Sequence, residues 1–145
     1  QDITMYQLLQ NIYVQYGFSK EKGISVVKKG KSGAEEIEAM MKNFRENPLQ
    51  EIAGSKVSLF YDYASLKGYS YIDKETITLD MPTTSNVLQY FTEDNTKVSI
   101  RPSGTEPKIK FYCEVHSKVK SLENLPEAEK AAEEKINQIK VSLGI

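Results

Sequence analysis

The sequence predicts an α+β domain in which a mostly antiparallel sheet of about four strands packs against helices on one face. Two observations support this class. Apolar residues recur every three or four positions near both ends of the chain, whereas between residues 56 and 116 they alternate with polar residues. The 145 residues are enough for one domain with a core and a short appended segment.

The first helical pattern covers residues 4–16, and Gly17 is a suitable residue to end it. Its apolar stripe consists of Met5, Leu8, Leu9, Ile12, Tyr13 and Tyr16. Because no strand precedes this helix, we expect its partner to lie outside the sequence. The chain also starts with Gln1 rather than Met. We therefore interpret it as a piece of a longer protein.

A short strand and a basic Gly/Ser turn follow in "GISVVKKGKSG", residues 23–33. We expect a domain boundary here, with residues 1–30 forming the tail of a preceding domain and residues 31–145 forming the main domain. The second helix begins after this turn. Ser32 and Glu35 fit a capping box, and the helix is expected to end before Pro48. Its apolar stripe consists of Ile37, Met40, Met41 and Phe44.

The period then changes to two, which is typical of strands. Residues 56–63 predict one strand and residues 76–80 another. Residues 87–92 and 97–101 predict a hairpin whose turn is "EDNT". In "KIKFYCEVH", residues 108–116, the apolar residues Ile109, Phe111, Cys113 and Val115 share one face.

The last helix is expected to begin near Pro126, because proline suits the first turn of a helix. Glu127 and Glu129 complement the positive end of its dipole. Its buried stripe is predicted to be Ala128, Ala132, Ile136, Ile139 and Leu143.

Composition argues against several classes of partner. The 19 basic and 20 acidic residues give a formal net charge of -1, which does not favour nucleic-acid binding. No apolar run approaches the ~20 residues that cross a bilayer, so no membrane partner is expected. Cys113 is the single cysteine and cannot form an internal disulfide, which favours a cytoplasmic location.

The loop "RPSGTEPK" between two predicted strands carries more chemistry than a hairpin turn needs. Arg101 offers a planar fork of donors, and Ser103 and Thr105 offer hydroxyl donors. Gly104 lets backbone N–H groups approach a ligand, and Lys110 can add a second cation. These roles suit a phosphate. The alternative is that Ser, Gly, Thr and Pro only form the turn, with Arg101 solvated at a strand end.

The stretch "IRPSGTEPKIKFY" closely resembles the phosphate-binding signature of the C-terminal domain of the α-D-phosphohexomutases, the phosphoglucomutase/phosphomannomutase family. The resemblance extends to "VLQYFTEDNTKVS" before it and to "KGKSGAEEIEAMMKNFRENP", which resembles the leading helix of that domain. It implies a fold like that of the TATA-binding protein. Residues 1–30 would then be the tail of the preceding sugar-phosphate mutase domain.

The resemblance implies a four-domain enzyme, an intramolecular phosphotransferase that interconverts hexose 1-phosphates and 6-phosphates. A phosphoserine in the first domain and Mg²⁺ bound in the second would act on the substrate, with a hexose 1,6-bisphosphate as activator. By the same resemblance, Arg101, Ser103, Gly104 and Thr105 hold the phosphate that is not transferred. Lys110 stands where relatives often carry a basic residue aimed at that phosphate.

The chain itself contains no Asp-rich metal loop and no serine in a convincing nucleophile setting. We therefore expect no catalytic residue, metal or cofactor in this fragment, and no activity from it alone. Its expected partners are a phosphosugar and the other domains of the same polypeptide. A non-catalytic phosphosugar-binding or regulatory module is the alternative.

Three other features are assigned structural roles. We expect Cys113 to lie in the core and His116 to be solvated at a strand end. The aromatic cluster in "FYDYASLKGYSY" is interpreted as sheet packing rather than as a platform for stacking single-stranded nucleic acid.

Overall fold

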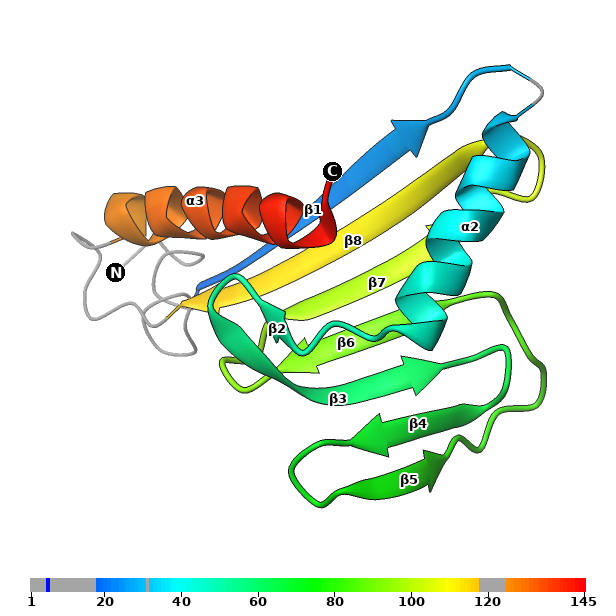
Figure 1. The fold of residues 1–145 in the computed structure, drawn as a ribbon. Helices are drawn as coiled ribbons and strands as arrows, with labels where there is room; N and C mark the ends of the chain where they lie inside the picture. The colour runs from blue at the N-terminus through cyan, green and yellow to red at the C-terminus, as the bar shows by residue number, and fades with distance from the viewer. Residues whose placement is uncertain (1–4, 6–17, 31, 118–124) are drawn as a thin grey trace.

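The computed structural model describes residue 5 and residues 18–30, 32–117 and 125–145. Figure 1 shows a twisted sheet with helices in front of it. This arrangement confirms the expected α+β class, with its mostly antiparallel sheet and its helices on one face. The helix expected at residues 4–16 lies outside the described residues except for residue 5.

Within the described residues the sheet contains eight strands. In chain order these are β1 (Phe18–Val27), β2 (Glu51–Ile52), β3 (Ser55–Asp62), β4 (Lys67–Ser70), β5 (Glu75–Thr78), β6 (Leu88–Thr92), β7 (Lys97–Pro102) and β8 (Lys108–Ser117). Their order across the sheet is β1-β8-β7-β6-β3-β4-β5, with β2 paired to β3. Every recorded pairing is antiparallel.

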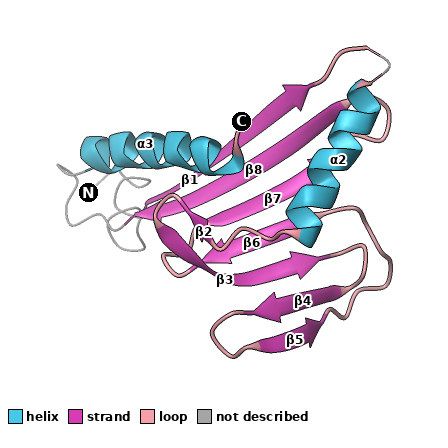
Figure 2. Ribbon diagram, viewed as in Figure 1, coloured by secondary structure: helices cyan, strands magenta, loops and turns pink. Residues whose placement is uncertain are grey.

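The two helices, α2 (Gly33–Glu46) and α3 (Leu125–Leu143), cover the same face of the sheet (Figure 2). The opposite face of the sheet is called the open face below. Neither of these helices, nor any other helix among the described residues, is long and apolar enough to cross a bilayer. Among the described residues, the sheet therefore has one face that builds the core and one that neither α2 nor α3 covers.

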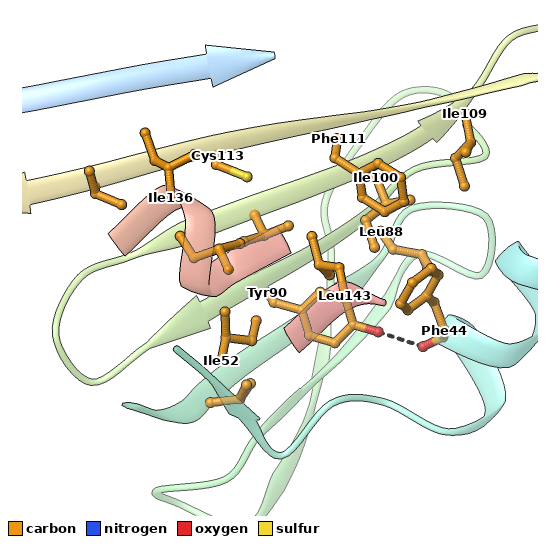
Figure 3. Close-up of a cluster of buried hydrophobic side chains, with 14 of the residues drawn as sticks. Phe44, Ile52, Leu88, Tyr90, Ile100, Ile109, Phe111, Cys113, Ile136 and Leu143 are labelled. Carbon is orange, nitrogen blue, oxygen red and sulfur yellow. Dashed lines mark hydrogen bonds between the residues drawn. The ribbon is translucent and has the colours of Figure 1, made fainter. Parts of the chain in front are cut away.

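The core lies between the helices and the sheet (Figure 3). The apolar side chains of β8 alternate as expected, and the whole predicted stripe of α3 is buried. Tyr90 is fully buried, and its hydroxyl donates a hydrogen bond of 2.5 Å to the carbonyl oxygen of Phe44. This bond ties β6 to the last turns of α2 and satisfies a carbonyl that the helix leaves free.

The sheet is wider than the expected four strands, for a local reason. The strands that the sequence pattern missed, β2 and β4, have two and four residues, too few for alternation to be recognised. They form because neighbouring strands supply hydrogen-bond partners. The irregular pairing between Val57 and Leu59 also breaks the alternation in β3, so that Val57 and Ser58 are both buried.

The expected capping box at the start of α2 is wrong. Ser32 has helical backbone angles and its side chain makes no capping hydrogen bond. The reason is the preceding turn, in which the Gly33 amide bonds to the Gly30 carbonyl and places Ser32 within a helical turn. The expected end of the helix is confirmed, since α2 stops at Glu46 just before Pro48.

The boundary expected near residue 30 falls in the turn between β1 and α2. On its N-terminal side, β1 pairs with β8 over all ten of its residues. The strand before this boundary thus shares a sheet with those after it. The division of the chain at residue 30 stays a prediction.

Candidate functional site

The loop that joins β7 to β8, residues 103–107, is closed at its base by backbone hydrogen bonds. The Ser103 amide bonds to the carbonyl of Lys108 at 2.8 Å, and the Lys108 amide bonds to the carbonyl of Glu106 at 2.8 Å. Pro102 and Pro107 stand at its two ends and limit the conformations of the chain there. The sequence thus folds into a short β7–β8 loop with its polar residues at the tip.

Two cations stand side by side at the base of this loop. Arg101 on β7 and Lys110 on β8 are direct cross-strand partners, and both project from the open face. Neither forms an ion pair or side-chain hydrogen bond with another described residue. Like charges directly opposite each other destabilise a sheet. This cation pair, Arg101 and Lys110, therefore costs the fold stability that a bound anion would restore.

The hydroxyl residues of the loop are drawn together. The Thr105 amide donates to the Oγ of Ser103 at 3.4 Å, and the two side-chain oxygens lie 3.5 Å apart. The side chain of Ser103 thus orders the loop and keeps both hydroxyls near its tip. The loop brings together the two alcohols that the sequence singled out.

The fold does not require a glycine at position 104, at the tip of the loop. Its φ lies outside the left-handed region, and a Cβ added there would meet no atom within 4 Å. The space where a side chain would stand is therefore open. A ligand can approach the backbone of the loop from this side.

Two hollows flank the loop. One, with a volume of about 290 Å³, lies at the open face and is lined by Arg101, Pro102, Ser103, Gly104, Lys110 and Tyr112. The other, of about 530 Å³, lies between the loop and α2, and Thr105 lines it together with Arg101, Ser103 and Gly104. Four of the five expected site residues therefore meet in the first hollow, which we call the cation hollow. Thr105 lines only the second.

The loop rests on a tight contact that the sequence reasoning missed. A Cβ on Gly33 would lie 2.6 Å from the Lys28 carbonyl oxygen and 3.0 Å from the Cβ of Pro107. The Lys28 amide in turn bonds to the Pro107 carbonyl at 2.8 Å. Glycine is thus needed at position 33 because the start of α2 packs directly against the loop. The "SG" pair in the basic turn is the local signal for this close approach.

A second support, also missed, lies at the other end of α2. The guanidinium of Arg45 donates to Asp62 at 3.0 Å and to Asn86 at 2.6 Å. Asn86 lines the 530 Å³ hollow, so this network fixes one wall of it. No short motif could reveal the network, because its members lie on α2, at the end of β3 and before β6.

The other candidate residues have structural settings. Cys113 is buried, and burial raises the pKa of its thiol to about 11, so it is protonated near neutral pH. His116 is exposed at the end of β8, and its Nε2 lies 3.1 Å from Oε1 of Glu114. Phe60 packs in the core against Tyr90, whereas Tyr61 and Phe91 contact each other on the open face.

Comparison with protein families identifies the domain. The family model described as "Phosphoglucomutase/phosphomannomutase, C-terminal domain" matches residues 24–132. The chain belongs to this family. It is a phosphoglucomutase/phosphomannomutase C-terminal domain, as the resemblance in the loop indicated.

Curated relatives of this phosphoglucomutase/phosphomannomutase domain include two phosphoglucomutases of Staphylococcus aureus. That of strain N315 is 38% identical over 109 residues, and that of strain MRSA252 is 39% identical over 110 residues. Each alignment covers 75% of this chain and 19% of the relative. The chain thus matches about a fifth of the length of these relatives.

A search of solved structures aligns the whole chain with 25% of the open form of pp63/parafusin, a phosphoglucomutase from Paramecium. The sequence identity is 16% and the TM-score is 0.45.

Proposed function

We propose that this domain binds the non-reacting phosphate of a hexose phosphate within a larger phosphoglucomutase/phosphomannomutase. The observation that carries this proposal is the cation pair, which faces a hollow without an acidic partner among the described residues. Arg101 forms two parallel bonds to phosphate oxygens, and Lys110 adds a second charge. Ser103 and the backbone beside Gly104 donate to the remaining oxygens.

This binding mode suits an enzyme that moves a phosphoryl group between two carbons of one sugar. The sugar must present each end in turn to the same reacting centre. A phosphate site accepts both orientations, because it binds the phosphate whichever carbon carries it. Its charge-assisted bonds also hold the sugar in place and provide binding energy remote from the reacting bond.

The reaction itself belongs to other parts of the polypeptide in this proposal. Within the described residues, no three His, Cys, Asp or Glu side chains are grouped to hold a metal ion. They do not fit a magnesium site, and no step through Mg²⁺ is assigned to them. The phosphoserine, the metal and the bisphosphate activator are proposed to bind elsewhere in a cytoplasmic enzyme that interconverts hexose 1-phosphates and 6-phosphates.

Titration of the 145-residue chain with inorganic phosphate, followed by amide NMR, tests the site. We expect shifts concentrated at residues 101–110. Arg101→Ala is expected to weaken binding about 10- to 100-fold, the equivalent of about 1.5–3 kcal/mol for bonds to a charged group. Binding is also expected to weaken as salt rises.

Lys130→Ala serves as the matched control, because Lys130 is an exposed cation on α3. It should leave phosphate binding unchanged. Shifts scattered away from the loop, or equal affinities for Arg101→Ala and the parent chain, would overturn the proposal. A non-catalytic phosphosugar-binding module would show the same binding, and only the full-length gene separates it from an enzyme, through an upstream phosphoserine loop and Asp-rich loop.

A further inference from the structure

The open face next to the cation pair carries a row of polar side chains. Ser99 lies two residues before Arg101 on β7, and Tyr112 lies two residues after Lys110 on β8. Ser99 and Tyr112 are direct cross-strand partners, and Gln89 on β6 pairs with Ser99 from the other side. Two residues along a strand span about 7 Å, so this row lies about 7 Å from the cation pair that lines the cation hollow.

The hydrogen bonds in this row have a fixed direction. The Tyr63 hydroxyl donates to Oε1 of Gln89 at 2.7 Å, and Nε2 of Gln89 donates to Oγ of Ser99 at 3.1 Å. Ser99 therefore accepts a bond from the protein and keeps its own O–H to donate. Among the described residues no acceptor is recorded for that proton. The relay from Tyr63 orients Ser99 as a donor toward the open face.

A hollow of about 430 Å³ lies in front of Ser99, and its lining is polar and charged. Tyr112, Lys97 and Glu114 line it with Ser99, and so does Gly23 on β1, where an added Cβ would lie 3.6 Å from the Tyr112 ring. Tyr112 also lines the cation hollow, so the two hollows share this residue. Tyr112 is 47% exposed, and no hydrogen bond of its hydroxyl is recorded among the described residues.

We propose that the 430 Å³ hollow binds the hydroxyl-bearing sugar body of the ligand whose phosphate occupies the cation hollow. Ser99 donates to one sugar oxygen, and the Tyr112 hydroxyl bonds to another. This inference rests on the proposed phosphate site and adds to it the residues that recognise the sugar. A hydroxyl that fills such a hydrogen-bonding position discriminates more strongly than apolar contact does, because its absence leaves polar groups unpaired.

The test compares two probes, glucose 1-phosphate and inorganic phosphate, on the 145-residue chain by NMR titration. Ser99→Ala and Tyr112→Phe each remove one hydroxyl. Each is expected to weaken the binding of glucose 1-phosphate about 3- to 10-fold, which is the effect of losing one neutral hydrogen bond. The affinity for inorganic phosphate is expected to change by less than about twofold. Ser99→Thr keeps the hydroxyl and should retain the affinity for glucose 1-phosphate.

Ser55→Ala is the control, since Ser55 lies at the start of β3 and has no recorded side-chain hydrogen bond among the described residues. Equal affinities for glucose 1-phosphate in all variants, or equal losses for both probes, would overturn the sugar subsite and leave the phosphate site standing. If Arg101→Ala bound both glucose 1-phosphate and inorganic phosphate as tightly as the parent chain, the phosphate site would be rejected, and the sugar subsite with it.

Discussion

Two glycines near the β7–β8 loop are constrained for opposite reasons. Gly33 is enclosed, because a side chain there would collide with the backbone of Lys28. Gly104 is open, because a side chain there would meet nothing within 4 Å. The fold therefore accounts for the first glycine, whereas the proposed phosphate ligand would account for the second.

This contrast gives a paired prediction. Gly104→Ala should leave the melting temperature unchanged but weaken the binding of inorganic phosphate, since its methyl group occupies space that the ligand needs. Gly33→Ala should destabilise the domain by about 1–3 kcal/mol, because the backbone must shift to admit the methyl group. Thermal unfolding and phosphate titration of both variants separate the effects. Unchanged phosphate affinity in Gly104→Ala would place the ligand elsewhere.

The residues of the proposed site differ in how far the sequence could reveal them. Arg101, Ser103, Gly104, Thr105 and Lys110 fall within ten positions, so a local motif was enough to name them. The relay from Tyr63 through Gln89 to Ser99 joins the turn after β3 to β6 and β7, and it depends on the register of these strands. Register is set by long-range packing, which no local pattern records.

The hydroxyl of Tyr90 connects two elements, β6 and α2. Burial raises the pKa of this hydroxyl above its usual value, so it stays a donor to the Phe44 carbonyl throughout the ordinary pH range. Tyr90→Phe would leave that carbonyl without its partner, and we expect a loss of about 1–3 kcal/mol in unfolding free energy.

Chemical denaturation of Tyr90→Phe measures this loss. Tyr69→Phe is a suitable control, because no hydrogen bond of the Tyr69 hydroxyl is recorded among the described residues and its ring contact with Tyr71 survives the change. Equal stability of the two variants would contradict the assigned role of the bond.

The turn of the β6–β7 hairpin is held against α3 by Asp94, which pairs with Lys135. Burial of the Asp94 carboxyl opposes its ionisation, but hydrogen bonds from Lys135, Thr92 and Thr96 outweigh this and lower its pKa to about 2. The pKa is thus below that of the unfolded chain, near 3.9. The resulting stability is present above pH about 4 and is lost as the pH falls toward 2.

We therefore expect Asp94→Asn to be less stable than the parent chain at pH 6, with the difference shrinking between pH about 4 and 2. Urea unfolding at a series of pH values measures it. Asp80→Asn, a change at an exposed carboxyl, provides the baseline. A stability difference that stays constant down to pH 2 would show that the ion pair does not hold the hairpin to α3.

Elements with a long, regular pattern were predictable, whereas the short strands β2 and β4 were missed. The α3 stripe and the alternation of β8 follow from residue spacing alone, and both are confirmed. The pairing of β4 with β3 and β5 depends instead on a glycine at position 68, where a Cβ would lie 2.6 Å from the Tyr61 ring. Such a contact exists only once the sheet has formed.

At the scale of the whole molecule, the two faces of the sheet have separate tasks. The helices and the buried side chains stabilise one face, and the cation pair and the polar row occupy the other. The like charges of the cation pair, which have no ionic partner among the described residues, therefore do not disturb the core. A binding site can be kept on this face at a modest cost in stability.

This separation also predicts what the chain does alone. We expect the 145-residue chain to bind glucose 1-phosphate but not to convert it to glucose 6-phosphate, because a binding face without a phosphoryl donor cannot transfer the group. A coupled assay for glucose 6-phosphate, with Mg²⁺ and glucose 1,6-bisphosphate supplied, measures turnover. A full-length phosphoglucomutase added to the same mixture shows that the assay works. Turnover by the purified chain would mean that it carries its own reacting centre, and the division of labour proposed here would be wrong.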